Sequence, residues 1–390
     1  MRAALFAIAL LVVACVRSSP EEQSLSSAAR WLWSQQQPDG SWRSGQYAVL
    51  RSGQALTPFV LSALLSVPDE MSAAPKGAVD RALAFLRAQV DADGALGYAD
   101  PELLEYPTYA TSLAVRCLAK HGDPDDAALI GRMSTWLAAR QSSRWGGFGF
   151  GEVGLRDGDP GHTDVSHTRR ALEALRDAGA LTPKIRAGAL AFLDRTRHPV
   201  DGGFHYSPLV FGANKGGRDA EGRFRSYATA TCDALLAMRA AGVPADDPRI
   251  VAGRDWLAQH ASLDRVEGIS TEAPWSPALR FYHLAVRACV AAEFASIAEF
   301  DGVNESEETV RKLAGRLIAL QRSDGSYVNR RSPLQKEDDP LLATSHALLA
   351  WSSVRSTSRS RDPRSGRPSA SSGATSPSVA HAAPSDRDRP

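Results

Sequence analysis

A short glycine turn recurs along nearly the whole chain, each time after a helix-like segment. Its clear copies are Asp39-Gly40, Asp93-Gly94, Asp201-Gly202 and Asp324-Gly325, and degenerate copies are expected at Gly146-Gly147 and Glu267-Gly268. The copies lie roughly 55 residues apart, with one interval nearer 65, a period typical of stacked supersecondary units. One such unit cannot bury its apolar face alone, so the units must assemble into a ring or a stack.

The segment before each turn has the pattern of a half-exposed helix. In residues 81–86, as in the counterparts, apolar residues recur at steps of three and four with charged residues between them. Glycine then lets the chain leave the helix through a left-handed conformation. An aromatic residue follows most turns, and we expect it to fold back between adjacent units: Trp42, Tyr98, Phe148, Phe204 and Tyr327.

The segment after each turn is more apolar and richer in small residues, as in residues 234–238. Six of these segments align without gaps, and they begin at Thr57, Thr111, Thr168, Thr231, Tyr282 and Thr344. A helix that is apolar on nearly all sides is enclosed on all sides. The sequence therefore predicts an all-α (α/α)6 toroid, in which six outer–inner helix pairs with glycine turns surround a central cavity.

A helix that ends in glutamine, followed by Asp-Gly-Ser and an aromatic residue, resembles the prenyltransferase and squalene-oxidase repeat. The best copies are residues 37–42, Gln-Pro-Asp-Gly-Ser-Trp, and residues 321–327, Gln-Arg-Ser-Asp-Gly-Ser-Tyr. The resemblance covers residues 24–353 and implies the same toroid. This superfamily includes terpenoid cyclases, protein prenyltransferase β subunits and complement-like thioester domains, so the fold alone does not select a function.

Two of these functions lack their motifs in this chain. A thioester domain needs Gly-Cys-Gly-Glu-Gln, which is absent from the sequence. Residues 123–126 spell the D-x-D-D acid motif of squalene–hopene cyclases, but they lie on a connector between repeats. Aspartates at such positions are typical helix caps, and we interpret them so.

The prenyltransferase resemblance implies a zinc site. In that family, an Asp-x-Cys pair on one inner helix and the histidine of Tyr-His on the next hold the metal. Here Tyr282-His283 resembles the histidine motif and Cys232 has the same register one inner helix earlier, but Asp233 follows the cysteine instead of preceding it by two. The implied zinc ligands are Cys232, Asp233 and His283. The alternative is a buried thiol beside a polar cavity histidine.

Polar and ionisable residues also follow the shared threonine or tyrosine position of the inner segments. We expect them near one end of the inner barrel, and the candidate cavity residues are His167, Arg169, Arg170, Asp233, His283 and His346. Burying such groups is costly unless they pair. One interpretation is an internal salt-bridge set, for example Asp233 with Arg169 or Arg170. The other is a mouth that binds a polar head group above an apolar, aromatic-lined pocket.

The chain begins with the pattern of an export signal. Arg2 precedes an apolar run over residues 3–14, which is shorter than the roughly 20 residues of a membrane-spanning helix and fits a signal peptide over 1–14. The run ends in Val-Val-Ala-Cys, which resembles a bacterial lipobox and implies lipidation of Cys15, with a linker over 15–23. A lipidated chain would be held at a membrane, on the periplasmic side or at the outer membrane. The alternative is a plain signal peptide with an incidental cysteine.

The opposite end differs in composition. Residues 354–390 are mostly Ser, Arg, Pro, Ala and Asp, and they predict a disordered tail. The formal net charge of the 390 residues is +1, which gives no reason to expect a nucleic-acid partner.

Three functions remain open on this reasoning. We predict an exported, membrane-anchored toroid that binds a hydrophobic, isoprenoid-like ligand or a peptide in its central cavity. One alternative is a terpenoid-cyclase or prenyltransferase-like enzyme, for which zinc is the only cofactor implied. The other is a purely structural envelope protein.

Overall fold

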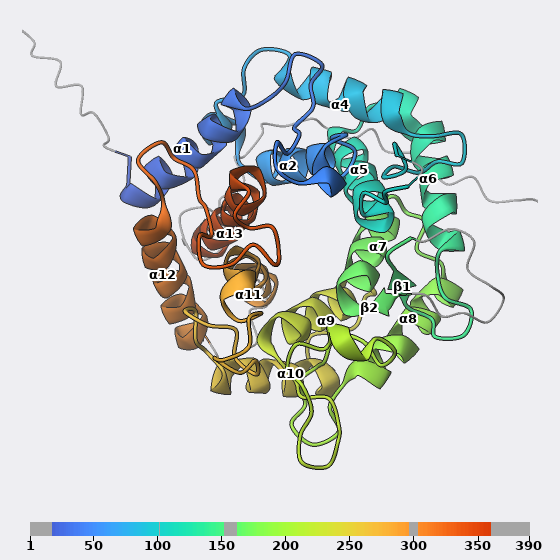
Figure 1. Ribbon diagram of the computed structural model, residues 1–390, viewed down its shortest axis with the longest axis vertical. Coiled ribbons are helices and arrows are strands. Elements are labelled where there is room, and N and C mark those ends of the chain that lie inside the picture. The colour runs from blue at the N-terminus through green and yellow to red at the C-terminus, as the bar shows by residue number, and fades with distance from the viewer. Residues whose placement is uncertain (1–17, 101, 152–161, 296–302, 360–390) are drawn as a thin grey trace, which may run out of the picture.

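The computed structural model describes residues 18–100, 102–151, 162–295 and 303–359, and their helices form two concentric layers (Figure 1). The outer layer consists of α1 (Pro20–Ser34), α4 (Ala78–Gln89), α6 (Ala127–Ala139), α8 (Pro183–Thr196), α10 (Pro248–Gln259) and α12 (Val303–Leu320). The inner layer consists of α2 (Leu56–Leu65), α5 (Pro107–His121), α7 (Val165–Asp177), α9 (Ala228–Ala240), α11 (Arg280–Ala295) and α13 (Pro340–Arg359). Outer and inner helices alternate along the chain, which confirms the predicted α/α toroid.

Smaller elements lie in the connections between these helices. The short helix α3 (Asp69–Ser72) follows α2, and the strands β1 (Phe148–Gly149) and β2 (Thr163–Asp164) pair antiparallel just before α7. In this register Phe148 lies opposite Asp164. The hairpin therefore fixes the backbone from which α7 starts.

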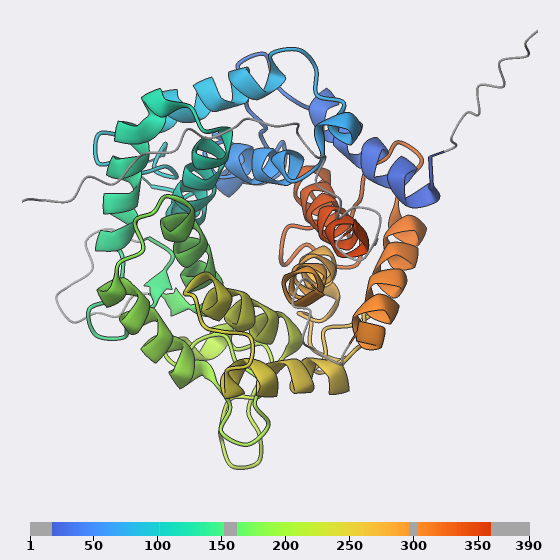
Figure 2. The same ribbon diagram turned by 180° about the vertical axis from the view of Figure 1, so that it is seen from behind.

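The ring is closed. Each inner helix contacts the next one, and α13 contacts both α11 and α2, while α1 contacts α12 and α13 (Figures 1 and 2). The glycine turns follow the same order. A Cβ atom on Gly40 would lie 2.2 Å from the carbonyl oxygen of Arg81 in the next outer helix, and one on Gly325 would lie 2.6 Å from that of Ser27 in α1. Both glycines have positive φ, so the turn needs glycine for its conformation and for its close approach.

The aligned threonines tie these turns to the inner helices. In each case the threonine hydroxyl accepts a hydrogen bond of 2.9–3.0 Å from the backbone N–H two residues after the turn glycine, and the pairs are Thr57 with Trp42, Thr111 with Leu96, Thr168 with Phe148, Thr231 with Phe204 and Thr344 with Tyr327. The side chains of these donor residues are fully buried between the layers. In the second unit Leu96 therefore fills the place that we predicted for Tyr98. The helix α11 has Tyr282 at the aligned position, and this tyrosine has another role, described below.

Of the aspartates in residues 123–126, Asp123 is a helix cap, as predicted. The side chain of Asp123 accepts a hydrogen bond from the backbone N–H of Asp125, and Asp126 forms a salt bridge of 2.7 Å with Arg87 of α4. They stabilise the connector before α6 and do not face the hollow.

The ends of the ring differ from the expected boundaries. The helix α1 starts at Pro20, inside the predicted linker, because Ser19 and Glu22 form a capping box. The helix α13 continues to Arg359, beyond the predicted end at 353, and Arg355 forms a salt bridge of 3.0 Å with Glu22. The signal peptide, Cys15 and the tail from residue 360 lie outside the described residues. Within the described part, no helix has the length and apolarity that a membrane crossing requires.

Candidate functional site

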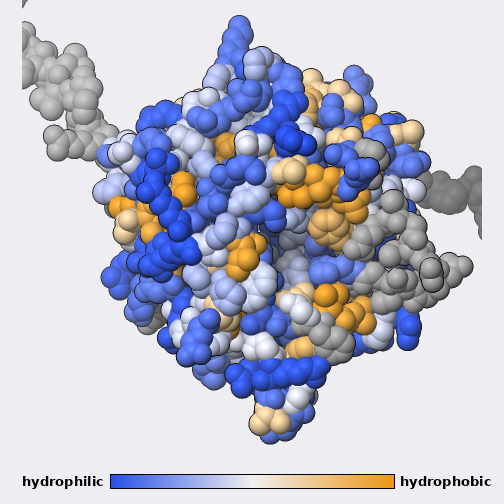
Figure 3. Space-filling view, in the orientation of Figure 1, coloured by the Kyte–Doolittle hydropathy of each residue, from blue (hydrophilic) through white to orange (hydrophobic). Residues whose placement is uncertain are grey.

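The first turns of the inner helices and the loops before them enclose a cavity of about 210 Å³ inside the ring. Five tyrosines line it, and we call it the tyrosine pocket: Tyr106, Tyr109, Tyr206, Tyr227 and Tyr282. Its other lining residues are Leu50, Ala55, Leu56, Phe59, Leu113, Ser166, His167, Lys215, Thr229, Ala230, Asp233, Leu279, Gln335, Lys336, Glu337, Leu342 and His346. The space-filling view shows a hollow near the centre of one face of the toroid, between polar and apolar patches (Figure 3).

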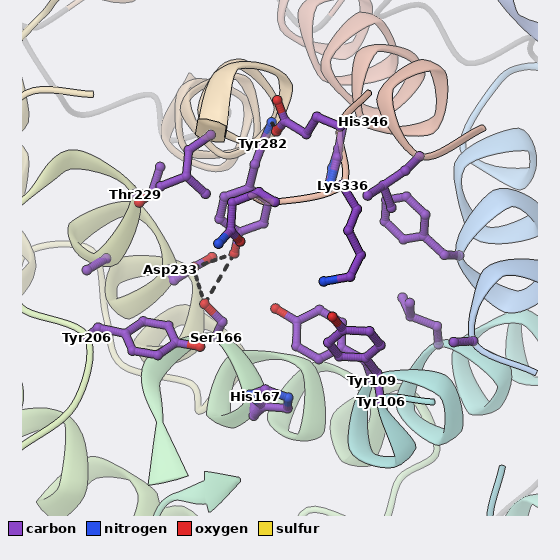
Figure 4. A pocket seen from close by; sticks show the side chains of 18 of the residues that line it. Tyr106, Tyr109, Ser166, His167, Tyr206, Thr229, Asp233, Tyr282, Lys336 and His346 are labelled. Atoms are coloured by element: carbon purple, nitrogen blue, oxygen red, sulfur yellow. Dashed lines mark hydrogen bonds between the residues drawn. The ribbon is translucent and has the colours of Figure 1, made fainter. Parts of the chain in front are cut away.

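The tyrosine pocket has an apolar wall and a polar wall. Phe59 of α2 and Leu113 of α5 belong to the apolar wall, whereas α7, α9 and α11 contribute Ser166, Asp233 and Tyr282. Figure 4 places Asp233 and Tyr282 across the pocket from Tyr106 and Tyr109. A ligand in this space would meet hydrocarbon on one side and hydrogen-bonding groups on the other.

Asp233 is the centre of the polar wall. Its Oδ2 atom accepts hydrogen bonds from the Ser166 hydroxyl at 2.8 Å and the Tyr282 hydroxyl at 2.5 Å, and its Oδ1 atom is 2.9 Å from Nη1 of Arg169 (Figure 4). The carboxylate is 1% exposed, so it is a buried charge with all its partners on neighbouring inner helices. These contacts hold α7, α9 and α11 in register around the pocket.

His167 and Asp164 form a second buried unit beside Asp233. Nδ1 of His167 is 2.6 Å from Oδ2 of Asp164, whose other oxygen accepts the backbone N–H of His167 at 2.9 Å and so caps α7. Burial disfavours the charged form of Asp164, but His167 and His162 outweigh that effect and hold the pKa of Asp164 below its usual range. The Nε2 atom of His167 has no hydrogen-bond partner within the described part of the chain.

Two lysines bring positive charge into the tyrosine pocket. Nζ of Lys215 lies 4.7 Å from the ring centre of Tyr206, and Nζ of Lys336 lies 5.6 Å from that of Tyr106. Figure 4 shows the Lys336 side chain extended into the pocket. Neither ammonium group has a carboxylate within salt-bridge distance among the residues described, and both lie over aromatic rings. Burial lowers the pKa of Lys215 from its ordinary value, although the charges of Asp164 and Asp233 act in the opposite direction.

Glu337 sets the position of Tyr282. Its carboxylate accepts the backbone N–H groups of Phe281 at 2.9 Å and Tyr282 at 2.7 Å, at the start of α11, and the side-chain amide of Asn329 at 3.0 Å. Burial raises the pKa of Glu337 to about 7, although these hydrogen bonds act in the opposite direction. The backbone beside it is also constrained, since Lys336 has a φ of 59° and Tyr106, across the pocket, has a φ of 50°. Non-glycine residues in this region are uncommon and concentrate at functional sites.

A second cavity of about 340 Å³ lies along later turns of the inner helices. We call it the arginine cavity, because Arg116, Arg169, Arg170 and Arg176 line it. Glu173 accepts charged hydrogen bonds from Arg169 at 2.7 Å, from Arg116 at 2.8 Å and from Arg170 at 3.1 Å. The predicted pairing of Asp233 with an arginine is therefore present through Arg169, while Arg170 pairs with Glu173 instead.

The zinc ligands implied by the prenyltransferase resemblance do not converge. Asp233 faces the tyrosine pocket, but Nε2 of His283 is 2.9 Å from the carbonyl oxygen of Ser262, outside both cavities. Burial raises the pKa of the Cys232 thiol to about 12 and, with Arg287, lowers the pKa of His283 to about 4. No group of three or more His, Cys, Asp or Glu side chains in the described residues could hold a metal ion. One step along a helix turns a side chain by about 100°, which separates Asp233 from Cys232 and Tyr282 from His283.

His346 lies where the two cavities meet, and it lines both, as does Tyr282. Its ring contacts Phe59 edge-on at 4.8 Å and Tyr282 at 5.4 Å between centroids. Burial, with a smaller contribution from Arg170, lowers the pKa of His346 to about 3, so this imidazole is neutral at pH 7. Of the predicted cavity residues, the tyrosine pocket thus holds His167, Asp233 and His346, and the arginine cavity holds Arg169, Arg170 and His346.

The sequence reasoning missed Lys215, Lys336 and Glu337, which reach the pocket from loops before α9 and α13. One signal was available for Tyr282. It occupies the aligned position that holds threonine in every other unit, and that threonine anchors a turn. Because Tyr282 does not anchor a turn, its side chain is available for another role, and this departure from the repeat marks it as a candidate site residue.

The fold and the pocket define the class of protein, an α/α toroid with a small ligand-sized cavity where its inner helices begin. Solved structures share this fold. The type II terpene cyclase MstE from Scytonema, in complex with its substrate geranylgeranyl dihydroxybenzoate, matches with a TM-score of 0.59 and 16% identity over 87% of this chain and 97% of that one. An unsaturated glucuronyl hydrolase specific for heparin matches with a TM-score of 0.59 and 13% identity over 87% and 97% of the two chains.

Cellobiose 2-epimerase from Spirochaeta thermophila DSM 6192 matches with a TM-score of 0.54 and 16% identity over 88% of this chain and 99% of that one. No protein-family model matches the sequence, and neither does any curated protein. At these identities the similarity establishes the toroid fold and leaves the chemistry to the site itself.

Proposed function

We propose that the tyrosine pocket binds a compact amphipathic anion, and that the protein is a ligand-binding toroid held at a membrane by a lipid anchor. The observation that carries the ligand proposal is the pair of lysines. Lys215 and Lys336 line one pocket without a carboxylate at salt-bridge distance in the described part of the chain. Burial disfavours the cation of Lys215, Asp164 and Asp233 offset part of that effect, and an anionic ligand would bring a counter-charge to salt-bridge distance.

The helices around the pocket act in the same direction. Each inner helix contributes residues of its first two turns, such as Phe59, Tyr109 and Tyr282. A helix N-terminus carries a partial positive charge, so these ends add to the potential of the two lysines. Together they favour a carboxylate or phosphate over a neutral head group.

The apolar wall and the volume narrow the rest of the ligand. Phe59 and Leu113 offer a hydrophobic surface opposite Asp233. The volume of about 210 Å³ is below the roughly 300–1,000 Å³ of sites for drug-sized ligands. A ring or a short chain with one anionic group fits these limits better than the long isoprenoid or the peptide expected from the sequence.

Calorimetric titration with small aromatic probes tests the ligand class. We expect benzoate and phenyl phosphate to bind, and neutral benzyl alcohol to bind more weakly by about tenfold or more. Lys215→Met and Lys336→Met should each remove most of that preference. Lys184→Met is the matched control, because Lys184 is exposed on α8. Equal affinity for benzoate and benzyl alcohol would refute the proposal.

The anchor is a separate proposal that rests on the lipobox-like sequence ending in Cys15. In a bacterial host fed radioactive palmitate, the full chain should be labelled and should sediment with membranes. Cys15→Ser should lose both properties, whereas Cys289→Ser should keep them. Absence of the label from the wild-type chain, or a label that persists in Cys15→Ser, would overturn the lipid anchor.

A further inference from the structure

The contacts of His167 resemble those that orient a histidine acting as a general base. Oδ2 of Asp164 lies 2.6 Å from Nδ1, and the backbone N–H of His167 is bonded to the other carboxylate oxygen, so both the ring and its backbone are fixed to one residue. A carboxylate can only accept at Nδ1, which places the ring proton there and leaves the lone pair on Nε2. His162 donates to the same carboxylate from 3.3 Å and adds to this restraint.

The lone pair of Nε2 has no use within the described part of the protein. Nε2 is buried without a hydrogen-bond partner, and His167 lines the tyrosine pocket (Figure 4). The ring is held edge-on against Tyr109, with 4.7 Å between centroids, and lies 5.8 Å from Phe150. These two rings fix the orientation of the imidazole, and a proton on a ligand bound in the pocket is a suitable partner for its lone pair.

We propose that His167 transfers a proton to and from a carbon beside the carbonyl group of a compact 2-oxo acid bound in the tyrosine pocket. This inference rests on the proposed function, because the pocket must first bind an anion. The two lysines that would hold the carboxylate also favour the negative charge that develops on the carbonyl oxygen.

The step balances without any further reactant. Nε2 takes the proton from the carbon, the electron pair of that C–H bond forms a carbon–carbon double bond, and the carbonyl electron pair moves to oxygen to give an enolate. The imidazolium then returns a proton to the enolate carbon or oxygen, which restores neutral His167. Return of the proton to oxygen gives the enol, and return to carbon gives the oxo acid with an exchanged proton; neither outcome needs an oxidation or a group transfer.

Deuterium exchange with phenylpyruvate measures this step directly. In D2O, proton NMR should show loss of the C3 protons at least about 10²-fold faster with the wild-type chain than with His167→Ala at equal concentration. Added imidazole should restore part of the rate to His167→Ala by filling the vacated space. His121→Ala should match the wild type, because His121 is exposed at the end of α5.

Binding separates the possible outcomes. If calorimetry shows that phenylpyruvate binds in a Lys215-dependent manner, but exchange is no faster than with His167→Ala, the proton-transfer inference is wrong and the pocket proposal stands. If benzoate, phenyl phosphate and phenylpyruvate all fail to bind, both are wrong. A circular dichroism spectrum and thermal midpoint for each variant show that the comparison is made between folded proteins.

Discussion

The tyrosine pocket and the arginine cavity lie in the same hollow and share Tyr282 and His346, yet they treat charge in opposite ways. In the arginine cavity, Glu173 is bonded to three arginines. In the tyrosine pocket, Lys215 has aromatic neighbours and no described ion pair. The arginines at the first site are paired within the protein, whereas the two lysines at the second have no ion pair among the described residues.

Local pairing and the helix ends explain why this difference matters. The arginine cavity lies mostly along later turns of the inner helices, and its Arg169 and Arg170, from the second turn of α7, are balanced by the carboxylate of Glu173. The tyrosine pocket lies at the N-terminal ends, where lysines add to a charge that is already positive. The arginines therefore serve the fold, and the lysines point to a ligand. Asp233 connects the two regions, because it bonds Tyr282 on one side and Arg169 on the other.

The largest expected effect is the loss of Glu173. Glu173→Gln leaves the buried guanidinium groups of Arg169 and Arg170 without their shared carboxylate, so the free energy of unfolding should fall by about 3–5 kcal/mol. Urea denaturation measures it, with exposed Glu308→Gln as the control that leaves stability unchanged. A loss below about 1 kcal/mol would mean that the arginine cavity is not held by its ion pairs.

As the pH falls, protonation of buried histidines should lower the stability of the fold before Glu173 of the arginine cavity loses its charge. Burial lowers the pKa of His205 and His283 to about 4 and that of His346 to about 3, below the ordinary value of 6.5. The unfolded chain then binds protons that the folded chain does not, so this stability is complete above about pH 6.5 and is lost as the pH falls toward 4.

Two carboxyl groups must be considered in interpreting the pH experiment. Arginine neighbours, against the opposing effect of burial, keep the pKa of Glu173 below its usual range, so Glu173 stays charged over this interval. The pKa of Glu337 is raised to about 7, and its contribution has the opposite sign, present below about pH 4.5 and lost as the pH rises through 7. The thermal midpoint should fall between pH 6.5 and 4, and less steeply in His346→Gln. An unchanged midpoint would contradict neutral buried histidines.

A smaller effect is expected from a threonine that anchors a turn. Thr231→Val keeps the shape of the side chain but leaves the buried backbone N–H of Phe204 unpaired, which should cost about 1–3 kcal/mol. Tyr282→Phe should cost less, because Asp233 keeps its bonds to Ser166 and Arg169. Denaturant unfolding of both variants compares them, and a larger loss for Tyr282→Phe would reverse the roles assigned to these aligned positions.

The smallest effect separates binding from folding at the tyrosine pocket. Lys215→Met removes a charge that the fold does not pair, so the free energy of unfolding should stay unchanged or rise by about 1 kcal/mol. The same variant should lose its preference for benzoate. A marked loss of stability would place Lys215 with the structural arginines and remove the contrast between the two regions.

The sequence predicts the fold well because the glycine turns are local and repeated. Each copy indicates the same close contact between a turn and the next outer helix, as at Gly40 and Gly325. The apolar inner segments likewise predict the two layers. The Asp233–Arg169 pair followed from the cost of burying an isolated charge.

The site is less predictable because it depends on angles and on loops. A register of aligned residues does not say which of Tyr282 and His283 turns inward, and the choice is set by Glu337 at the start of α11. Lys215 and Lys336 lie on the loops before α9 and α13, outside the aligned segments, and no repeat marks them. Their convergence with Asp233 is a property of the closed ring.

The seam between α12 and α1 is made like the other joints, since Gln321 donates to the carbonyl oxygen of Ser24 at 2.8 Å just as Gln36 donates to that of Ala78 at 2.9 Å. Topologically, the ring has no first member. A circular permutant can be made by joining α13 to α1 through a flexible linker and opening the chain between α5 and α6. This permutant should therefore fold into the same toroid and bind the same ligand.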